Sequence, residues 1–294
     1  MRLQKIYQKD FLTWDDYYFQ YQKNLAKEYY IPLLKNWGVK INGIKVLDIG
    51  CGNGGFITAF SENNCSCTGI EINNFNWEIK DSVEFLVGDI TDSSFNKYVS
   101  KKYHLIILRD VIEHIPLDNK TIFLESVLSL MSKQTKLLIT FPPFYSAFGL
   151  HQQSILKSKF KYFPFLSLFP HSLIKIILGT FQDKDSISKL KEIQNSRMTI
   201  NHFTNLISGL GFEILNSEKY FVRPSHEIRY GLKMRKIKKL DIEPIIKSVV
   251  DDFNSIYKLK RGINISYKND GKNKYLIYGI ENRIEQIVAN LLDN

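Results

Sequence analysis

The stretch KVLDIGCGNGG, residues 45–55, is a short apolar run that passes directly into a glycine-rich turn. Val46, Leu47 and Ile49 predict a buried strand, since parallel strands covered on both faces are almost continuously hydrophobic. The glycines let the backbone approach a ligand closely, and a helix predicted at 56–61 would present free N–H groups at its first turn. This strand, turn and helix begin an alternation that runs through the next hundred residues.

Four more strands are predicted, at 66–71, 83–87, 104–108 and 137–141, with an amphipathic helix at 121–131. Pro142 and Pro143 end the last of these strands, because proline cannot donate to a strand ladder. A helix at 200–210 and a strand at 212–220 follow, and the aromatic-rich residues 1–30 predict a helical arm. Strands separated by helices indicate a parallel sheet with helices on both faces. The predicted fold class is therefore α/β, with a Rossmann-like sheet.

The composition is that of a folded globular protein, with 44% apolar, 24% charged and 13% aromatic residues among 294. No uncharged apolar run reaches about 18 residues, so no membrane-spanning helix is expected. Cys65 and Cys67 stand too close for a relaxed bridge, and the odd count of three cysteines favours a reducing, cytoplasmic location.

The net charge is +10, and seven basic residues fall between Arg223 and Lys239. That stretch is interpreted either as a solvated linker or as a patch for phosphate, an anionic membrane or nucleic acid. No nucleic-acid-binding signature is recognisable, so no nucleic acid partner is expected.

Three acids lie at or just beyond the ends of predicted strands, at positions where they could contact a ligand. Residues 50–55 satisfy the dinucleotide pattern G-x-G-x-x-G, which is weak evidence alone. Glu71 ends the second strand, where an acid can accept hydrogen bonds from ribose hydroxyls, and Asp89 follows the third strand, where a carboxylate can accept from an adenine amino group. Asp48 would repel a pyrophosphate and attract a sulfonium or an ammonium. The acids therefore favour a positively charged adenosyl ligand over NAD.

Here the sequence resembles the class I S-adenosylmethionine-dependent methyltransferases, over roughly residues 25–235. The run VLDIGCGNGG, Glu71 and the step Gly88-Asp89-Ile90 match that family's cofactor motifs in order and spacing. The resemblance implies S-adenosyl-L-methionine as cofactor and methyl transfer as activity, with the glycine turn at the methionine part, Glu71 at the ribose and Asp89 at the adenine. The full cofactor-binding set is Asp48, Gly50, Cys51, Gly52, Asn53, Gly54, Glu71, Ile72, Asp89, Ile90 and Arg109.

The segment Asp110–Ile115, DVIEHI, resembles the segment after the fourth strand in methyltransferases of the quinone-biosynthesis type. Asp110, Glu113 and His114 stand at i, i+3 and i+4, so one helical turn would bring them together. Three interpretations remain open: His114 as a general base, the trio as a weak divalent-metal site, or a capping turn with a structural histidine. His114 and His151 are the predicted catalytic residues, and no metal is included in the predicted site.

Residues 143–195 are expected to form an aromatic-rich cap, since nine aromatic residues lie between Phe141 and Phe169. Tyr145 and His151 are candidates to contact the methyl acceptor, although plain aromatic packing fits Tyr145 equally well. The cap also carries Lys157, Lys159 and Lys161. It is interpreted as a lid on the sheet, or as a surface for a membrane or a lipid-like acceptor. The expected acceptor is an unidentified small molecule, hydrophobic or lipid-linked.

Residues 241–294 resemble the start of a sensor histidine kinase ATP-binding domain. A helix at 241–257, strands at 263–267 and 275–277, and a helix at 284–291 carry the resemblance, which would place Asn290 and Asn294 in that family's asparagine box. The later ATP-binding motifs and the phospho-acceptor histidine helix do not appear, so no kinase activity is expected.

The predicted domains are thus a methyltransferase domain at 1–240 and an incomplete kinase-like fragment at 241–294. Two other functions remain open: an NAD-dependent reductase, and a non-catalytic cofactor-binding module that carries a kinase fragment. The oligomeric state is not predicted.

Overall fold

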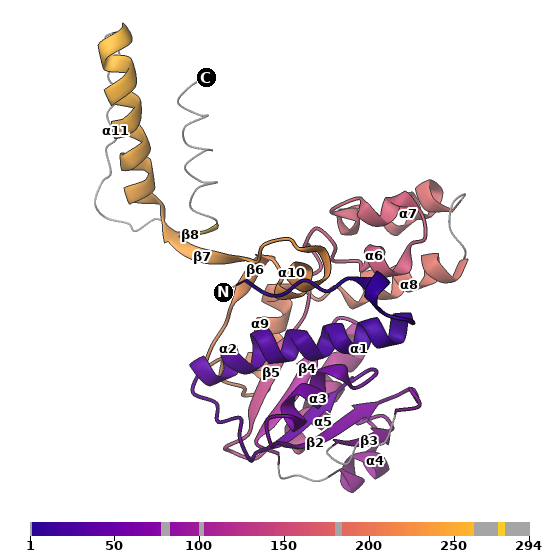
Figure 1. The fold of residues 1–294 in the computed structure, drawn as a ribbon. Helices are drawn as coiled ribbons and strands as arrows, with labels where there is room; N and C mark the ends of the chain where they lie inside the picture. Colours follow the sequence, from indigo (N-terminus) through magenta and orange to yellow (C-terminus); the bar gives the residue numbers. More distant parts are fainter. Residues whose placement is uncertain (1, 78–82, 100–102, 180–183, 262–275, 280–294) are drawn as a thin grey trace. The chain divides into compact units, whose positions relative to one another are not determined.

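Five parallel strands form the sheet at the centre of the larger part of the molecule (Figure 1). The computed structural model describes residues 2–77, 83–99, 103–179, 184–261 and 276–279. The sheet has the order β3-β2-β1-β4-β5. Its strands are β1 (Lys45–Ile49), β2 (Ser66–Glu71), β3 (Val83–Val87), β4 (Leu105–Arg109) and β5 (Lys136–Thr140). The predicted α/β fold class with a Rossmann-like sheet is confirmed.

Helices bury both faces of this sheet, which is why its strands are apolar at successive positions. Leu47, Ile49, Ile106 and Leu108 face one core, which they share with α4 (Ser93–Tyr98), α5 (Lys120–Ser129) and α9 (Ile200–Gly209). The alternate residues Val46, Leu105 and Ile107 are also buried. On that second face lies α3 (Gly55–Ser61), and α1 (Trp14–Leu25) packs beside it (Figure 1).

The predicted helical arm is α1, continued by a π-helical turn at Ala26–Tyr30 and by α2 (Ile31–Asn36). Thr13 caps α1 by accepting a hydrogen bond from the Asp16 N–H, as a side-chain oxygen at a helix N-cap commonly does. Tyr17 and Tyr21 on α1 are buried, and Tyr30 meets Phe56 of α3 edge to face at 5.4 Å between ring centroids. The aromatic residues of the arm therefore contribute to the core over α3.

Between β5 and α9 the chain forms a helical cap with an apolar core of its own. Its helices are α6 (Gln152–Ile155), α7 (His171–Leu178) and α8 (Lys184–Ser196), with 3₁₀ turns at Lys159–Tyr162 and Leu166–Leu168. The buried core of the cap consists of Phe144, Leu150, Leu156, Leu166, Ile174, Leu178, Ile187, Leu190 and Ile193. The cap thus has its own hydrophobic contacts to stabilise it.

The chain divides into two compact units, residues 6–215 and residues 216–294 together with 1–5. The second unit contains an antiparallel sheet of order β6-β7-β8, formed by β6 (Lys219–Val222), β7 (Arg235–Asp241) and β8 (Leu276–Gly279). It also contains α10 (Pro224–Tyr230) and α11 (Ile242–Arg261). The domain boundary predicted at 240/241 stays a prediction.

Two expectations are corrected in the second unit. The strand predicted at 212–220 is wrong, because β6 begins only at Lys219 and pairs with β7 rather than with the parallel sheet. For the basic stretch from Arg223 to Lys239, the interpretation as a solvated linker is wrong, because the stretch contains α10 and most of β7. The alternative, a patch for phosphate, an anionic membrane or nucleic acid, stays a prediction. One of its seven basic residues, Lys236, is paired with Glu218, with 2.6 Å between Nζ and Oε1.

The remaining predicted elements agree closely with the observed ones. The strands at 45–49, 66–71 and 83–87 have the predicted bounds, and those at 104–108 and 137–141 are displaced by one residue. The helix predicted at 241–257 is α11, and the strand predicted at 275–277 overlaps β8. The strand at 263–267 and the helix at 284–291 lie outside the described residues. Within the described parts of the chain, no helix combines the length and the apolarity needed to span a membrane.

Candidate functional site

The candidate site lies where the strand order reverses, at the carboxyl ends of β1 and β4. From β1 the chain adds β2 and β3 on one side, whereas β4 and β5 occupy the other side. Ligands of open α/β sheets bind at such a switch point, outside the carboxyl ends of the strands. Ile49 pairs with Leu108, so the turn after β1 and Arg109 on β4 lie beside each other at this edge.

Gly52 and Gly54, in the turn after β1, both have positive φ angles, but their surroundings differ. Gly54 has φ 81°, and a Cβ there would come within 2.5 Å of the Phe85 ring. Gly52 has φ 55° with open space around it, so its backbone is left accessible. The side-chain amide of Asn53 donates to the Asp15 carbonyl at 3.2 Å and ties the turn to the start of α1.

Glu71, at the end of β2, accepts hydrogen bonds from two backbone N–H groups beside the turn. Its Oε2 lies 3.0 Å from the Gly52 nitrogen and its Oε1 lies 2.9 Å from the Ile72 nitrogen. The Trp77 indole donates to the Gly52 carbonyl at 2.8 Å and stacks on Phe85, with 4.8 Å between ring centroids. Trp77 was not among the predicted residues, since nothing in its sequence neighbourhood distinguishes it from a core aromatic residue.

Asp89 and Ile90 lie after β3 in different environments. Asp89 is exposed, and its Oδ1 accepts from both the N–H and the hydroxyl of Thr91 at 2.8 Å. Ile90 is buried in the core shared with α4 and α5, so its side chain packs there. The Ile72 side chain is largely exposed after β2. The adenine end of the predicted site is therefore the most open part.

Asp48 and Arg109 form the buried electrostatic centre of the site. Burial raises the pKa of Asp48 to about 7; Arg109 opposes this shift and Glu71 adds to it. The Arg109 guanidinium lies over the Phe56 ring at 4.7 Å, with its Nη1 3.6 Å from Asp110 Oδ2. Burial alone would lower the pKa of Arg109, but Asp110 and nearby acidic groups outweigh it and raise the pKa, so this cation is permanent.

Three residues beside this centre have environments that the sequence did not indicate. Tyr18 and Tyr21 of α1 are close enough to Arg109 to raise its pKa, so the helical arm takes part in forming the site. Cys51 is buried in the turn, and burial raises the pKa of its thiol, with Asp48 and Glu71 adding to the effect. The Cys51 thiol therefore stays protonated at neutral pH.

A second group of side chains, the Glu113–His114–His151 cluster, lies where the cap meets the segment after β4. Glu113 Oε1 is 3.5 Å from His151 Nε2 and 4.0 Å from His114 Nε2. The two imidazole rings are 4.9 Å apart between centroids and nearly perpendicular. Glu113 is almost fully buried, whereas half of the His114 side-chain surface is exposed. The structure thus brings both predicted catalytic histidines together around one buried carboxylate.

Asp110, the third member of the predicted trio, has other partners. It has φ 56°, its N–H donates to the Thr140 carbonyl at 2.8 Å, and its Oδ1 accepts from the Thr140 hydroxyl at 3.2 Å. Asp110 therefore joins the ends of β4 and β5. His151 takes its place in the cluster.

Lys120 is a site residue that sequence analysis missed. Its side chain is fully buried, and its ammonium donates to the carbonyls of Ile112 and Ile115 and to the Ser196 hydroxyl at 2.6–2.8 Å. Burial lowers the pKa of Lys120 to about 8, against the opposing effect of Glu113. A lysine at the start of an amphipathic helix normally points to solvent, so only tertiary packing identifies this role.

The cap segment that carries His151 is held by close backbone contacts. A Cβ at Gly149 would overlap the Phe144 carbonyl, and the His151 N–H donates to the Phe148 carbonyl at 3.0 Å. Tyr145 is half exposed and accepts a hydrogen bond from Arg197 at 3.2 Å. Of the two acceptor-side candidates in this segment, His151 reaches the cluster and Tyr145 contacts Arg197.

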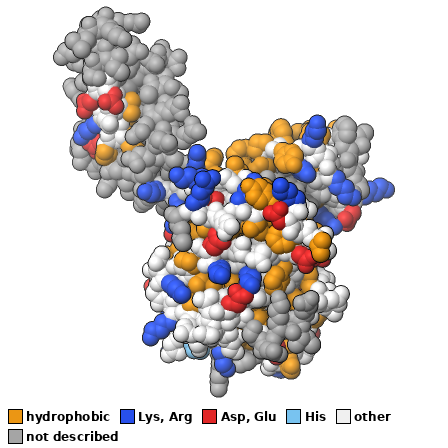
Figure 2. Space-filling view, in the orientation of Figure 1, with side chains coloured by type: hydrophobic (Ala, Val, Ile, Leu, Met, Phe, Trp, Pro, Cys, Tyr) orange, Lys and Arg blue, Asp and Glu red, His pale blue; other side chains and the backbone are white. Residues whose placement is uncertain are grey.

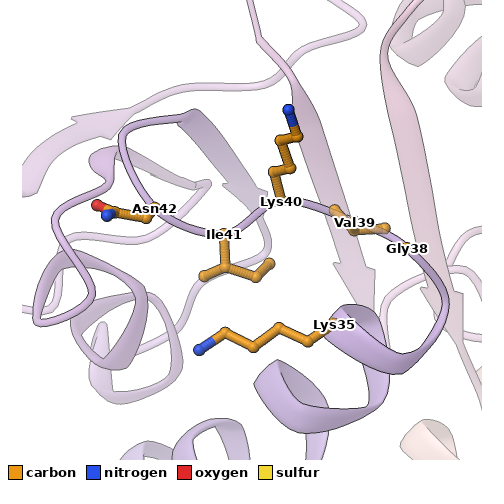
Figure 3. Close-up of a pocket in the computed structure, with 6 residues that line it drawn as sticks. All are labelled: Lys35, Gly38, Val39, Lys40, Ile41 and Asn42. Carbon is orange, nitrogen blue, oxygen red and sulfur yellow. The ribbon is translucent and has the colours of Figure 1, made fainter.

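A shallow cavity of about 410 Å³ lies elsewhere, at residues that include Lys35, Val39 and Ile41 (Figure 3). These residues lie between the end of α2 and the start of β1, hence at the amino edge of the strands. None of the predicted site residues lines this cavity. Because the switch-point chemistry is at the opposite edge, we do not place the candidate site there.

Comparison with known proteins gives one family match and several similar structures. The family model described as a methyltransferase domain matches residues 21–175. The plantazolicin methyltransferase BpumL, crystallised with a monoazolic desmethylPZN analog and SAH, has 17% identity over 67% of this chain and 66% of its own, with a TM-score of 0.43. Magnesium protoporphyrin IX methyltransferase from Synechocystis PCC 6803, with bound SAH, has 16% identity over 74% and 81%, with a TM-score of 0.43.

A third similar structure is a TehB-like SAM-dependent methyltransferase from Corynebacterium glutamicum ATCC 13032. It has 20% identity over 42% of this chain and 71% of its own, with a TM-score of 0.34. The chain therefore spans just under two thirds of the plantazolicin enzyme. No curated protein matches the sequence.

Proposed function

The chain belongs to the family of methyltransferase domains, matched over more than half of its length, and on that premise we propose that it transfers a methyl group from S-adenosyl-L-methionine to a small-molecule acceptor. The observation that carries the proposal is the buried Asp48 beneath a glycine turn at the switch point of the sheet. A carboxyl group in that place favours a cationic ligand over a diphosphate.

The donor set at the carboxyl edge fits this cofactor. Gly52 leaves the turn backbone open, and Asp48 is the acid proposed for the positively charged methionine end. Glu71 is oriented for the ribose hydroxyls by its bonds to the Gly52 and Ile72 N–H groups. Asp89, whose Oδ1 accepts a hydrogen bond from the Thr91 N–H, is proposed to accept another from the adenine amino group. The other residues of the predicted cofactor-binding set are likewise proposed to lie at the cofactor.

When bound, S-adenosylmethionine supplies an electrophilic methyl group on a positively charged sulfur. The chain's own contribution is to hold the acceptor in line with that methyl group and to exclude water, which accounts for much of the rate in such reactions. Arg109 remains protonated beside Asp48, so its positive charge balances the negative charge of the ionised Asp48 carboxylate.

His114 and His151 are the proposed catalytic residues on the acceptor side. Both belong to the Glu113–His114–His151 cluster, whose segments follow β4 and β5 at the same edge of the sheet as the glycine turn. An imidazole that contacts a hydroxyl acceptor can accept its proton as the methyl group is transferred. The acceptor class that the cap favours is hydrophobic or lipid-linked, because the cap is rich in aromatic side chains.

Calorimetry with S-adenosylhomocysteine and with NAD tests the proposed function. We expect the adenosyl ligand to bind at a stoichiometry of one and NAD not to bind. Binding of NAD without binding of the adenosyl ligand would contradict the proposal and favour the reductase alternative. Binding of the cofactor without turnover on any acceptor would favour the non-catalytic module.

We also propose that the cap contacts an anionic membrane surface. Residues 141–182 contain no Asp or Glu, and they include lysines at 157, 159, 161 and 175. Figure 2 shows hydrophobic side chains beside basic ones over the cap. The exposed large apolar side chains among the described residues of this range are Tyr145, Tyr162, Phe163, Phe165, Leu168, Leu173 and Ile176. Apolar side chains interspersed with lysines favour the interface of an anionic bilayer.

Sedimentation with lipid vesicles tests this contact. We expect binding to phosphatidylcholine–phosphatidylglycerol vesicles, and weaker binding to phosphatidylcholine alone. Ile176→Ser in α7 should reduce binding, whereas Ile122→Ser, a comparably exposed residue of α5, should leave it unchanged. Equal binding of both variants and the parent chain would contradict the proposed surface.

A cytoplasmic location is proposed from the cysteines. Cys51, Cys65 and Cys67 are all free thiols and all buried. The Cys65 thiol donates to the Ile41 carbonyl at 2.6 Å. Mass spectrometry of alkylated protein from intact cells should find all three cysteines reduced.

For residues 241–294, the kinase-like resemblance stays a proposal. What supports it is the order of α11 and β8, although the two asparagines of the resembled box lie outside the described residues. Titration of the full chain with magnesium and ATP should show no binding if the segment lacks kinase function. Stoichiometric ATP binding would contradict that expectation.

A further inference from the structure

We propose that Glu113, His114 and His151 bind one divalent transition-metal ion, and that its open coordination position holds the oxygen of the methyl acceptor. Metal binding itself is argued from the geometry of the cluster alone. The task of holding the acceptor rests on the proposed methyltransferase function. With the ion bound, the two histidines would hold it in place of accepting the acceptor's proton themselves.

The ligand atoms already converge. One potential ligand atom from each of the three side chains, a carboxylate oxygen or an imidazole nitrogen, lies within 4.8 Å of the other two. The distance between Glu113 Oε1 and His151 Nε2 is 3.5 Å. In a tetrahedral site with metal–ligand bonds of about 2.0–2.1 Å, ligand atoms lie about 3.4 Å apart. The Glu113–His151 pair thus has this spacing, and the distances between the other ligand atoms need to shorten by about 1.4 Å at most. Rotation of the half-exposed His114 side chain can supply that movement.

Both segments that supply ligands are held in place by buried contacts. Lys120 binds the carbonyls of Ile112 and Ile115, which flank Glu113 and His114 in the chain. On the cap side, Gly149 precedes His151 by two residues, and its backbone packs directly on the Phe144 carbonyl. A metal site needs such rigid support, because its ligands must be positioned before the ion binds.

The ligand types favour a transition metal over magnesium. Two imidazoles and one carboxylate are the protein ligands of zinc sites that leave a fourth position open for water or substrate. Magnesium prefers an all-oxygen octahedron and would be poorly served by two nitrogens. A hydroxyl bound to such an ion has a lowered pKa. The ion would therefore hold the acceptor oxygen and make it a better nucleophile, and the hydroxyl proton would pass to solvent, because both imidazoles would be occupied as ligands.

Cobalt titration tests the site without any measurement of activity. The full chain is dialysed against a chelator and titrated with Co²⁺, whose visible absorption reports nitrogen and oxygen ligation. We expect one equivalent to bind and Zn²⁺ to displace it, while Mg²⁺ does not. His151→Ala and Glu113→Gln should each weaken Co²⁺ binding by about tenfold or more, since a ligand matters at least as much as the groups that orient it. His202→Ala, a histidine of α9 outside the cluster, should leave binding unchanged.

Calorimetry with S-adenosylhomocysteine on the same samples separates the two proposals. His151→Ala should bind this ligand within about twofold of the parent chain, which also shows that the variant is folded. If His151→Ala unfolds, His151→Gln replaces it. No visible absorption, or equal Co²⁺ affinity in both cluster variants and the parent chain, would overturn the metal site. Co²⁺ binding by a chain that does not bind the adenosyl ligand would instead refute the proposed function and leave the metal site standing.

Discussion

The buried carboxyl group of Asp48 makes cofactor affinity depend on pH in a way that can be calculated. Its pKa is raised to about 7 by burial. An ammonium at the methionine end of the cofactor interacts favourably with the carboxylate and not with the neutral acid. Binding therefore strengthens as the pH rises through the pKa. With a pKa near 7, about one tenth of Asp48 is ionised at pH 6 and about nine tenths at pH 8, so affinity should rise about tenfold, or about 1.4 kcal/mol.

The assay is calorimetric titration with S-adenosylhomocysteine at a series of pH values. Methylthioadenosine, which lacks the amino acid end, is the control ligand and should bind with nearly constant affinity. Asp48→Asn should bind S-adenosylhomocysteine weakly and without the rise between pH 6 and pH 8, since its side chain does not ionise. A flat profile for the parent chain, or an equal slope in Asp48→Asn, would refute the assignment of this acid to the cationic end of the cofactor.

Two further predictions concern residues on either side of the switch point. Glu71→Ala should weaken S-adenosylhomocysteine binding by at least about tenfold, because charge-assisted hydrogen bonds contribute about 1.5–3 kcal/mol. Calorimetry should show no change for Glu125→Ala, at an exposed position of α5, and equal affinities would remove Glu71 from the site. Lys120→Met should lower the free energy of unfolding by about 3 kcal/mol, because it leaves three buried acceptors without their donor. Urea unfolding measures this, with Lys136→Met, at the exposed start of β5, expected within about 0.5 kcal/mol of the parent chain.

The cofactor side of the site could be predicted because its signals are local. The apolar run at 45–49, the glycines that follow it and the acid at the end of the next strand are close enough in sequence to be recognised together. Parallel strands then bring Glu71 to the turn, where it meets the Gly52 N–H. The solvated linker interpreted at 223–239 was wrong, because the stretch forms α10 and most of β7, and α10 buries residues such as Ile228. Such burial cannot be recognised from the local charge pattern.

The acceptor side could be predicted only in part. The spacing of Asp110, Glu113 and His114 suggested that one turn would unite them, yet the left-handed backbone at Asp110 turns it toward Thr140. His151 was a candidate from its place after β5, but its contact with Glu113 depends on how the cap folds back. No local pattern shows such a contact.

The amino-acid sequence by itself determined the parallel sheet and the edge of it that carries the candidate site, because strand burial and glycine turns follow from residues that are neighbours in the chain. Only the tertiary structure decided that Lys120 is buried, that Asp48 titrates near neutrality and that two histidines meet one carboxylate. Desolvation and the convergence of ligand atoms depend on which distant segments pack together.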